Sequence, residues 1–367
     1  MTLQQRIADK TAAVCVVGLG YVGLPLALTL ADIGYMVIGI DHDEKKVKAI
    51  QAGEPVLGDE PGVQELARRM LHSGRFEAAT EYDALEDADI ILVCVETPVD
   101  TETHKPGYIM LRSALQEVRC YMQTNTLIII ESTLAPGTMQ DVVKPALGTL
   151  DGDPSDYIYL AHCPERVQPG RLLETLFTRP RVVGGMTPQA GKLAAQLYRQ
   201  ITSGEVDETD CLTAEIVKTA ENAYRDVQIA FANTLALLCE DLGADVWRVR
   251  ELVNKCPYRN VHEPGAGVGG HCIPKDPWLL IANAENSNGK HLIWAARRVN
   301  EYMAYHMIGL LSDALSEAEV PITQARIVVL GYSYLPGSAD TRNTPSEVVV
   351  SWLREHAAEV RVHDPYV

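Results

Sequence analysis

The stretch Ala13-Val-Cys-Val-Val-Gly18-Leu-Gly20-Tyr-Val-Gly23 decides the fold of this 367-residue chain. An apolar run of strand type enters a G-x-G-x-x-G turn, and residues 24–33 then have helical character. A second apolar run, Met36-Val-Ile-Gly-Ile40, ends at Asp41. This order predicts a βαβ unit, because the glycines allow a tight turn and a close approach of the backbone to a pyrophosphate.

Asp41 indicates which dinucleotide the turn would bind. It follows Gly20 by about 20 residues, the spacing at which a carboxylate accepts hydrogen bonds from the ribose diol and repels a 2′-phosphate. The sequence therefore predicts NAD rather than NADP as the cofactor. In the alternative interpretation, these are ordinary turn glycines and Asp41 caps a helix.

The remaining pattern predicts an α/β fold with more than one domain. Further strand-like runs at 90–95, 127–130 and 157–160 alternate with helical segments, which is typical of a doubly wound, Rossmann-like parallel sheet. Residues 211–242 contain no Gly or Pro and predict one long helix with much of its surface buried. The apolar residues at helical spacing are Ile216, Ala220, Ala223, Val227, Ile229, Phe231, Leu235 and Leu238. Another helix is expected at 293–317.

A strand at 326–331, a helix at 346–356 and a strand at 360–363 begin a second Rossmann-like domain. One βαβ unit cannot bury both faces of a parallel pair, so we expect this domain to be incomplete in 367 residues. The predicted division is an NAD-binding domain at 1–209, a helical middle and dimerisation domain at 210–318, and a partial C-terminal domain at 319–367.

Composition excludes several classes of protein. The net charge of −17 argues against binding to nucleic acid. No apolar run reaches the roughly 18 residues that a membrane span needs, and the N-terminus lacks the apolar core of a secretory signal. Eight scattered cysteines without zinc-like spacing predict reduced, mostly buried thiols, no metal site and a cytoplasmic location.

Cys272 is the candidate nucleophile. It lies in Gly265-Ala-Gly-Val-Gly-Gly-His-Cys-Ile-Pro-Lys-Asp276, where neighbouring His, Lys and Asp side chains could favour a thiolate. Glycines there would also leave room for a ligand. A purely structural cysteine is the alternative, and Asp276 could equally be the N-cap of the following helix.

Two further groups could take part in chemistry. Glu215, Lys218 and Asn222 share one face of the long helix, which suits proton transfer or the stabilisation of an oxyanion. Glu165 follows a strand and could position a hydrolytic water. A solvated helix face and a salt-bridge partner are the respective alternatives.

In these stretches the chain resembles the UDP-glucose and GDP-mannose dehydrogenase family, most closely the branch that oxidises UDP-N-acetyl-D-mannosamine. The resemblance extends from about Ala13 to the last residue. The matching stretches are Val17–Pro25, Glu96-Thr-Pro98, Glu131-Ser-Thr133, Cys163-Pro-Glu-Arg-Val-Gln-Pro-Gly170, Glu215-Ile-Val-Lys-Thr-Ala-Glu-Asn222, Gly267–Asp276 and Asp340-Thr-Arg342.

The resemblance implies a four-electron oxidation of a primary alcohol to a carboxylate. Cys272 would attack the aldehyde from a first hydride transfer, and a second NAD would oxidise the thiohemiacetal to a thioester that water hydrolyses to the uronic acid. Lys218 and Asn222 would stabilise the oxyanion, and Asp276 would assist proton transfer. Glu165 would orient or deprotonate the water that Thr133 holds.

The resemblance also implies the contacts with cofactor and substrate. The expected NAD contacts are Gly18, Gly20, Tyr21, Val22, Gly23, Asp41, Thr97 and Thr133. The expected UDP-sugar contacts are Glu165, Arg166, Lys218, Asn222, Arg259, His262, Gly269 and Arg342. A homodimer built by the long helix is expected, with a product used in polysaccharide biosynthesis.

The choice of sugar is indicated only by two features. His271 stands where UDP-glucose enzymes usually have Ser, and Cys163-Pro-Glu-Arg166 resembles the N-acetylhexosamine branch. One departure is Leu335 after Tyr334, where many members have Lys, which removes an expected cation from the nucleotide site. UDP-N-acetylglucosamine or UDP-glucose remain alternative substrates. A two-electron β-hydroxyacid dehydrogenase and a non-catalytic nucleotide-sugar sensor are the alternatives of other classes.

Overall fold

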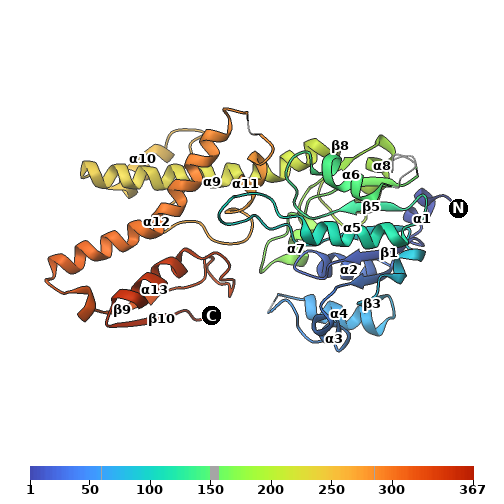
Figure 1. Cartoon of the computed structure of the whole chain (residues 1–367), viewed down its shortest axis with the longest axis horizontal. Helices are drawn as coiled ribbons and strands as arrows, with labels where there is room; N and C mark the ends of the chain where they lie inside the picture. The colour runs from blue at the N-terminus through green and yellow to red at the C-terminus, as the bar shows by residue number, and fades with distance from the viewer. Residues whose placement is uncertain (59, 149–156, 285) are drawn as a thin grey trace. The chain divides into compact units, whose positions relative to one another are not determined.

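The computed structural model describes residues 1–58, 60–148, 157–284 and 286–367 (Figure 1). The chain divides into two compact units, Met1–Thr219 and Ala220–Val367. Helix α9 (Cys211–Leu242) begins in the first unit and continues into the second. None of the described helices combines the length and the apolar character that a membrane span requires.

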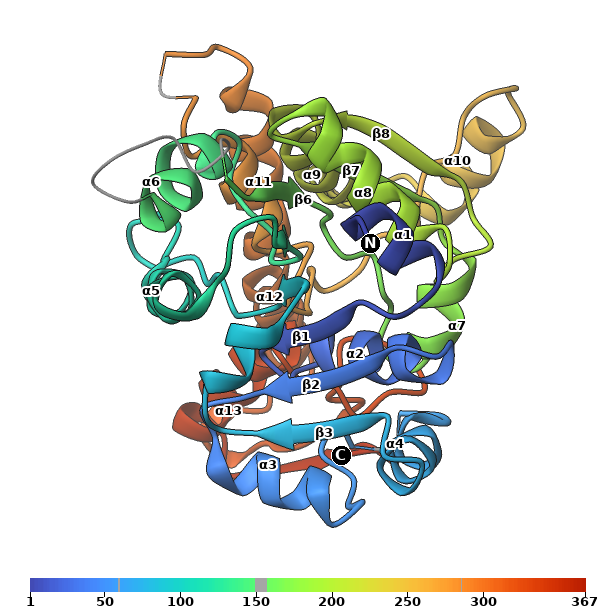
Figure 2. The ribbon, with the colours of Figure 1, turned by 90° about the vertical axis from the view of Figure 1, so that its right-hand side faces the viewer.

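A single sheet of the order β3-β2-β1-β4-β5-β6-β7-β8 forms the centre of the first unit. Its strands are β1 (Ala13–Val17), β2 (Met36–Ile40), β3 (Phe76–Ala79), β4 (Ile90–Val93), β5 (Leu127–Ile130), β6 (Tyr159–His162), β7 (Arg181–Gly185) and β8 (Val206–Asp210). Figure 2 shows β1, β2 and β3 side by side, as their parallel registers require. All neighbours are parallel except β6 and β7, so the doubly wound prediction is confirmed with one antiparallel pair added.

Helices cover both faces of this sheet. The helical segments are α1 (Leu3–Ala8), α2 (Gly23–Asp32), α3 (Glu44–Gln51), α4 (Val63–His72), the 3-10 segment η1 (Asp83–Asp87), α5 (Ile109–Tyr121), the π-helical η2 (Met139–Val143), α6 (Lys144–Leu147), α7 (Leu172–Thr178) and α8 (Pro188–Tyr198). Alternate strand residues face two separate cores: Val14 and Val16 pack with α2 and α8, whereas Cys15 and Val17 pack with α5 and η2. This alternation explains why the central strands are apolar throughout.

In the second unit, long helices are joined by buried polar contacts. After α9 come α10 (Val246–Asn254), α11 (Asp276–Ile281), α12 (Lys290–Glu317), the 3-10 segment η4 (Ile322–Gln324), β9 (Arg326–Leu330), α13 (Pro345–His356) and β10 (Glu359–His363). Buried Arg297 of α12 donates to Asp226 of α9 at 2.8 Å, and Asn300 donates to the same carboxylate at 2.8 Å. Strands β9 and β10 pair in parallel, as the predicted βαβ unit requires.

The length of α9 is as expected, but its predicted burial is partly wrong. Ile216, Phe231 and Leu238 are exposed, Phe231 to 58%. The buried positions of the helix are filled mainly by alanines, such as Ala223 and Ala230, and by polar side chains. Small residues allow neighbouring segments to approach closely, which leaves the larger apolar side chains on the outer surface.

The cysteines are all free thiols, yet only half are buried. Cys15, Cys163, Cys211 and Cys239 are buried and Cys94 is partly buried. Cys120, Cys256 and Cys272 are exposed. The expectation of mostly buried thiols is therefore too strong, and Cys272 is one of the accessible ones.

Candidate active site

The turn between β1 and α2 has the backbone geometry of a dinucleotide-binding loop. Gly18 has φ +94°, and a Cβ there would lie 2.8 Å from the Cys94 carbonyl oxygen. A Cβ on Gly23 would lie 1.8 Å from the Gly18 carbonyl oxygen, so this position tolerates only glycine. A Cβ on Gly20, in contrast, would meet nothing within 4 Å, so that side of the turn is open to a pyrophosphate.

Asp41 lies at the end of β2 beside this turn. Its Oδ2 accepts hydrogen bonds from the Leu19 backbone N–H at 2.9 Å and from Lys46 Nζ at 2.8 Å. Burial opposes ionisation, but the hydrogen bonds from Lys46, Asp43 and Leu19 outweigh it and lower the pKa of Asp41 below its usual value. An ionised carboxylate is therefore in place for a ribose diol, and the turn and Asp41 together fit NAD.

Thr97 and Thr133 lie after two neighbouring strands, β4 and β5, at the same edge of the sheet as the glycine turn. Thr97 Oγ1 donates to the Thr133 carbonyl at 2.6 Å, and Ser132 Oγ donates to the Val95 carbonyl at 2.6 Å. These bonds join the two loops. The structure thus brings Thr97 and Thr133 together, as expected of residues that share one ligand.

Glu165 follows β6 at this same edge and is almost completely buried. One carboxylate oxygen accepts the Arg166 backbone N–H, and the other accepts Arg181 Nη1 at 2.7 Å. Arg166 Nη1 donates to the Pro180 carbonyl at 3.0 Å. The Arg181 guanidinium therefore holds Glu165 in one orientation. Glu165 is both a salt-bridge partner and a positioned carboxylate, so its two alternative interpretations are compatible.

Three residues beside Glu165 were missed by sequence reasoning as site candidates. Buried Tyr198 donates from its hydroxyl to Glu131, and the Arg181 guanidinium carbon lies 5.7 Å from the centre of the Tyr198 ring. The sequence does contain one indication of these residues, which is a charged side chain next to apolar ones. Glu131 directly follows an apolar strand, and Arg181 precedes Val-Val.

Glu215 and Lys218 lie on the first turns of α9 and are both buried. Glu215 accepts backbone N–H groups of Gly137 and Met139, each at 2.7 Å, and so fixes the loop that follows Thr133. Burial raises the pKa of Glu215 to about 7, although these two N–H groups lower it. Lys218 is one turn before Asn222, so the two side chains share a face of the helix.

Within the second unit, the structure brings together Asn222, Asp276 and Cys272. Asn222 Nδ2 donates to Asp276 Oδ2 at 2.6 Å, and the Asp276 backbone N–H donates to the Cys272 carbonyl at 2.8 Å. Asp276 is the first residue of α11 rather than its N-cap, which is Lys275, so the capping interpretation is wrong. Its buried side chain is directed to Asn222 instead of to the helix backbone.

The Cys272 loop is covered by the segment after β9. A Cβ on Gly269 would lie 2.4 Å from Tyr334 Cβ, and one on Gly270 would lie 2.8 Å from the Tyr334 ring. Gly270 also donates its N–H to the Arg342 carbonyl at 2.8 Å. Arg342 pairs with Asp340 through two bonds of 2.9 and 2.6 Å, so its guanidinium is held in a fixed orientation.

Arg259 and His262 make local contacts of another kind. Arg259 Nη1 donates to the Pro257 carbonyl at 3.0 Å, and His262 bonds with Arg225 at 2.8 Å and with Gln228 at 3.2 Å. Burial and the neighbouring guanidinium of Arg225 lower the pKa of His262. Their expected contacts with substrate stay predictions.

Comparison with known proteins identifies relatives of the whole chain. The NAD binding domain, central domain and UDP binding domain of the UDP-glucose/GDP-mannose dehydrogenase family match residues 12–202, 212–302 and 328–367. The solved UDP-D-ManNAc dehydrogenase of Pyrococcus horikoshii is 40% identical, with a TM-score of 0.89 over 97% of this chain and 84% of that chain.

Two further solved structures are similar. The UDP-N-acetyl-mannosamine dehydrogenase of Staphylococcus aureus is 34% identical, with a TM-score of 0.87 over 97% of this chain and 83% of that one. A UDP-glucose dehydrogenase of Pyrobaculum islandicum is 30% identical, with a TM-score of 0.85 over 96% of this chain and 82% of that one. The similarity therefore includes both compact units.

Proposed function

Because the chain belongs to the UDP-glucose/GDP-mannose dehydrogenase family, we propose that it oxidises the C6 alcohol of UDP-N-acetyl-D-mannosamine to a carboxylate through a thioester on Cys272. It is an NAD-dependent UDP-sugar dehydrogenase. The sugar is supported by relatives named UDP-N-acetyl-D-mannosamine dehydrogenase, which are 34–40% identical over nearly the full chain. His271 and the Cys163-Pro-Glu-Arg166 tetrapeptide agree with that choice.

Bound NAD would supply the chemistry of hydride acceptance, and two equivalents are needed: one for oxidation of the alcohol to the aldehyde, and one for oxidation of the thiohemiacetal on Cys272 to the thioester. The residues that would hold it are the glycines of the β1–α2 turn, together with Tyr21, Val22, Asp41, Thr97 and Thr133. The open side of Gly20 and the ionised Asp41 support this assignment.

Cys272 acts as the nucleophile in the proposed mechanism. Its thiolate adds to the aldehyde carbon, forming a C–S bond while the carbonyl electron pair moves to oxygen. The exposed thiol and the glycine-rich loop support access of a substrate. The bond from the Asp276 N–H to the Cys272 carbonyl keeps the nucleophile at a defined place on its loop.

Lys218 and Asn222 stabilise the oxyanion that this addition creates. An ammonium and an amide N–H on one helix face are suitable donors for a developing negative charge. Asp276 accepts the Asn222 amide, so one N–H is already committed while the second remains available to a ligand. Asp276 also provides an acceptor for the proton that the substrate alcohol loses.

Glu165 and Thr133 serve the final hydrolysis. Glu165 orients or deprotonates the water whose oxygen attacks the thioester carbon, and the C–S bond breaks to release the Cys272 thiolate. Because Arg181 already fixes Glu165, the carboxylate loses little orientational freedom in this step. Arg166, Arg259, His262, Gly269 and Arg342 are the remaining proposed UDP-sugar contacts.

The hydrogen-bonded series Asn222–Asp276–Cys272 is the single observation on which the covalent mechanism most depends. The test is the ratio of NADH formed to sugar consumed for UDP-N-acetylmannosamine, UDP-N-acetylglucosamine and UDP-glucose in parallel. Two equivalents with the first sugar alone support the proposal. One equivalent with an aldehyde or ketone product contradicts the thioester route, and binding without turnover favours the sensor.

We further propose a homodimer and the three-domain division 1–209, 210–318 and 319–367. Exposed apolar side chains on α9, including Tyr224, Phe231 and Leu238, support association through this helix. Arg342 would then meet the nucleotide at a site shared between subunits. Eight free thiols support the cytoplasm as the location.

A further inference from the structure

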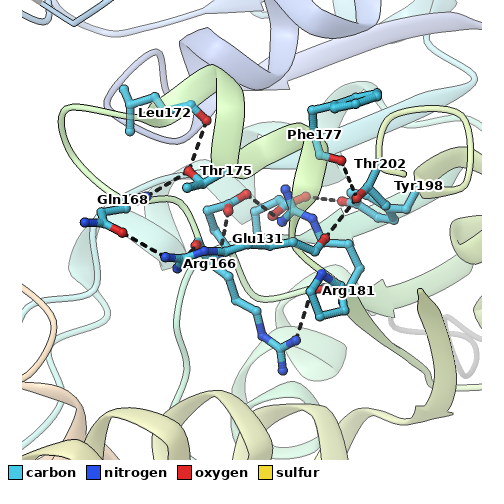
Figure 3. Close-up of polar contacts among 12 residues, drawn as sticks. Glu131, Arg166, Gln168, Leu172, Thr175, Phe177, Arg181, Tyr198 and Thr202 are labelled. Carbon is cyan, nitrogen blue, oxygen red and sulfur yellow. Dashed lines mark hydrogen bonds and ion pairs between the residues drawn. The ribbon is translucent and has the colours of Figure 1, made fainter. Parts of the chain in front are cut away.

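Four buried side chains that bind protons or carry charge meet behind the carboxyl edge of the sheet. Glu131 follows β5, Arg181 begins β7 and Tyr198 ends α8 (Figure 3). The fourth residue, Glu165, follows β6. In this order, the four side chains are exposed to only 1%, 1%, 0% and 6%. Such a cluster is expensive to bury unless its charges balance.

The two carboxyl groups of this cluster accept different sets of hydrogen bonds. Glu165 accepts both Arg181 Nη1 at 2.7 Å and the Arg166 backbone N–H. Glu131 accepts only the Tyr198 hydroxyl on one oxygen, and its other oxygen has no hydrogen-bond partner within the described ranges. The arrangement therefore favours the anion at Glu165 and the neutral acid at Glu131.

Charge counting leads to the same assignment. One guanidinium, which is always charged, faces two carboxyl groups, so full ionisation would leave one buried negative charge. Within the part of the chain that the structure describes, the groups that face Glu131 include one cation: they are the buried carboxyl of Glu165, the guanidinium of Arg181, the phenol of Tyr198 and the thiols of Cys94 and Cys163. A single proton on Glu131 makes the cluster neutral.

The pKa of Glu131 agrees with the presence of a proton on this residue. Burial, reinforced by the negative charge of Glu165, raises the pKa of Glu131 to about 8, although Arg181 and Tyr198 oppose the shift. Burial also raises the pKa of the Tyr198 phenol far above its usual value, so the phenol remains a hydrogen-bond donor. Below about pH 8, Glu131 is thus the protonated member of the pair.

We propose that Glu131 is a positioning residue that holds a proton near neutral pH and so reserves the Arg181 guanidinium for Glu165, keeping Glu165 anionic and oriented for hydrolysis of the thioester. This inference rests on the proposed role of Glu165. When Glu131 ionises, two carboxylates compete for one guanidinium and an uncompensated negative charge lies beside the attacking water. Both effects slow a hydrolysis in which negative charge develops.

The test measures release of the acid in a single turnover, from the thioester onward, between pH 6 and 10. In the wild type, the rate of hydrolysis should fall by about fivefold or more between pH 7 and 9.5, because Glu131 loses its proton over this range. Glu131→Gln cannot ionise but still accepts the Tyr198 hydroxyl, so its rate should stay within about twofold over this range. An alkaline decline of wild-type size in Glu131→Gln overturns the inference.

Tyr198→Phe provides a second variant with a directional result. Removing the phenol removes a hydrogen bond that favours the Glu131 anion, so the alkaline decline should move to higher pH. A decline that stays in place or moves to lower pH contradicts the inference. Glu174→Gln is the matched control, because that exposed carboxylate lies on α7 and pairs with Arg171. It should reproduce the wild-type profile.

An infrared measurement separates this inference from the proposed function. At pH 7 the wild type should show a carbonyl stretch of a protonated carboxylic acid that is additional to any band of Glu215, that disappears as the pH rises through about 8, and that is missing from Glu131→Gln. If this band is present but the enzyme releases no acid, the proposed function fails while the protonated Glu131 is supported. If the enzyme forms two NADH per sugar and the band is absent, the inference alone fails.

Discussion

Asn222 donates a 2.6 Å hydrogen bond from its amide to the Asp276 carboxylate, and this bond joins the long helix to the loop that contains the proposed nucleophile. Asp276 is buried, and its other oxygen lies 3.7 Å from Lys275 Nζ. The proposed oxyanion donor and the nucleophile are therefore positioned by one short series of contacts, and weakening either end should disturb both.

Asn222→Ala should reduce kcat by about 10²- to 10³-fold, because it removes a donor to the oxyanion. It also removes the hydrogen bond to Asp276 Oδ2, which should cost about 1–3 kcal/mol of stability. Steady-state kinetics and thermal unfolding measure the two effects. Thr234→Val is the control, since that hydroxyl donates to the Ala230 carbonyl of the same helix at 2.8 Å, and its loss should leave kcat unchanged. Equal kcat values for Asn222→Ala and wild type would remove Asn222 from the mechanism.

Cys272→Ser should stop formation of the acid while a weak first oxidation persists, because a serine hydroxyl is a poor nucleophile without an activating base. We expect the rate of acid formation to fall by at least about 10³-fold. Product analysis by mass spectrometry separates aldehyde from acid. Cys256→Ser, another exposed cysteine of the second unit, should behave as wild type. Acid production by Cys272→Ser at the wild-type rate would refute the covalent role.

Asp41→Ala should weaken NAD binding by about 10- to 100-fold, since a charged hydrogen-bond acceptor for the ribose is lost. Lys46 loses its 2.8 Å carboxylate partner at the same time, so its ammonium becomes available to a 2′-phosphate. The preference for NAD over NADP should therefore relax. Asp43→Ala, which removes only the N-cap of α3, should retain the preference. Calorimetric titration with both dinucleotides decides between these outcomes.

Glu215→Gln should flatten the dependence of stability on pH. Burial raises the pKa of Glu215 from 4.5 to about 7, so the folded protein keeps this proton to higher pH than the unfolded chain does. The contribution of Glu215 to the free energy of unfolding is complete below pH 4.5, and it is lost as the pH rises through about 7. Over this window the wild-type unfolding midpoint should fall by about 2–5 °C relative to the variant. Exposed Asp313→Asn is the control, and identical slopes for all three proteins would contradict the prediction.

Phe231→Asp should dissociate the proposed homodimer, because it places a charge on an exposed apolar surface of α9. Light scattering at several concentrations measures the mass. Phe177→Asp introduces the same charge at a similarly exposed position on α7 and should leave the dimer intact. A monomeric wild type, or a dimeric Phe231→Asp, would exclude this face as the interface.

The first strands and the long helix could be predicted because their signals are local. The Gly18 turn, the apolar strands around it and the Gly- and Pro-free run of α9 specify their conformations without reference to distant residues. Strand β6 is displaced by two residues from the predicted 157–160, since the strand continues to buried His162. Here the hydrophobic pattern locates the strand but not its ends.

Strands β7 and β8 could not be foreseen from apolar character. Strand β7 begins with Arg181 and ends with two glycines, and β8 contains Asp207, Glu208 and Asp210. A tertiary contact stabilises the charged end of β7: Arg181 pairs with Glu165, which is adjacent only after folding. For the same reason, the site prediction found Glu165 but missed Glu131 and Tyr198, whose importance depends on which charges meet in the interior.

Tyr334 leaves no space for a Cβ at Gly269 or Gly270, the two glycines that precede His271 and Cys272. During evolution, a substitution at one of these three positions therefore depends on the residues at the other two. An alanine at position 269 would clash with the Cβ of residue 334, so it would be tolerated only in a lineage whose residue 334 had already become glycine, and the φ of +89° at Gly270 disfavours any side chain there. The three positions should therefore remain fixed together.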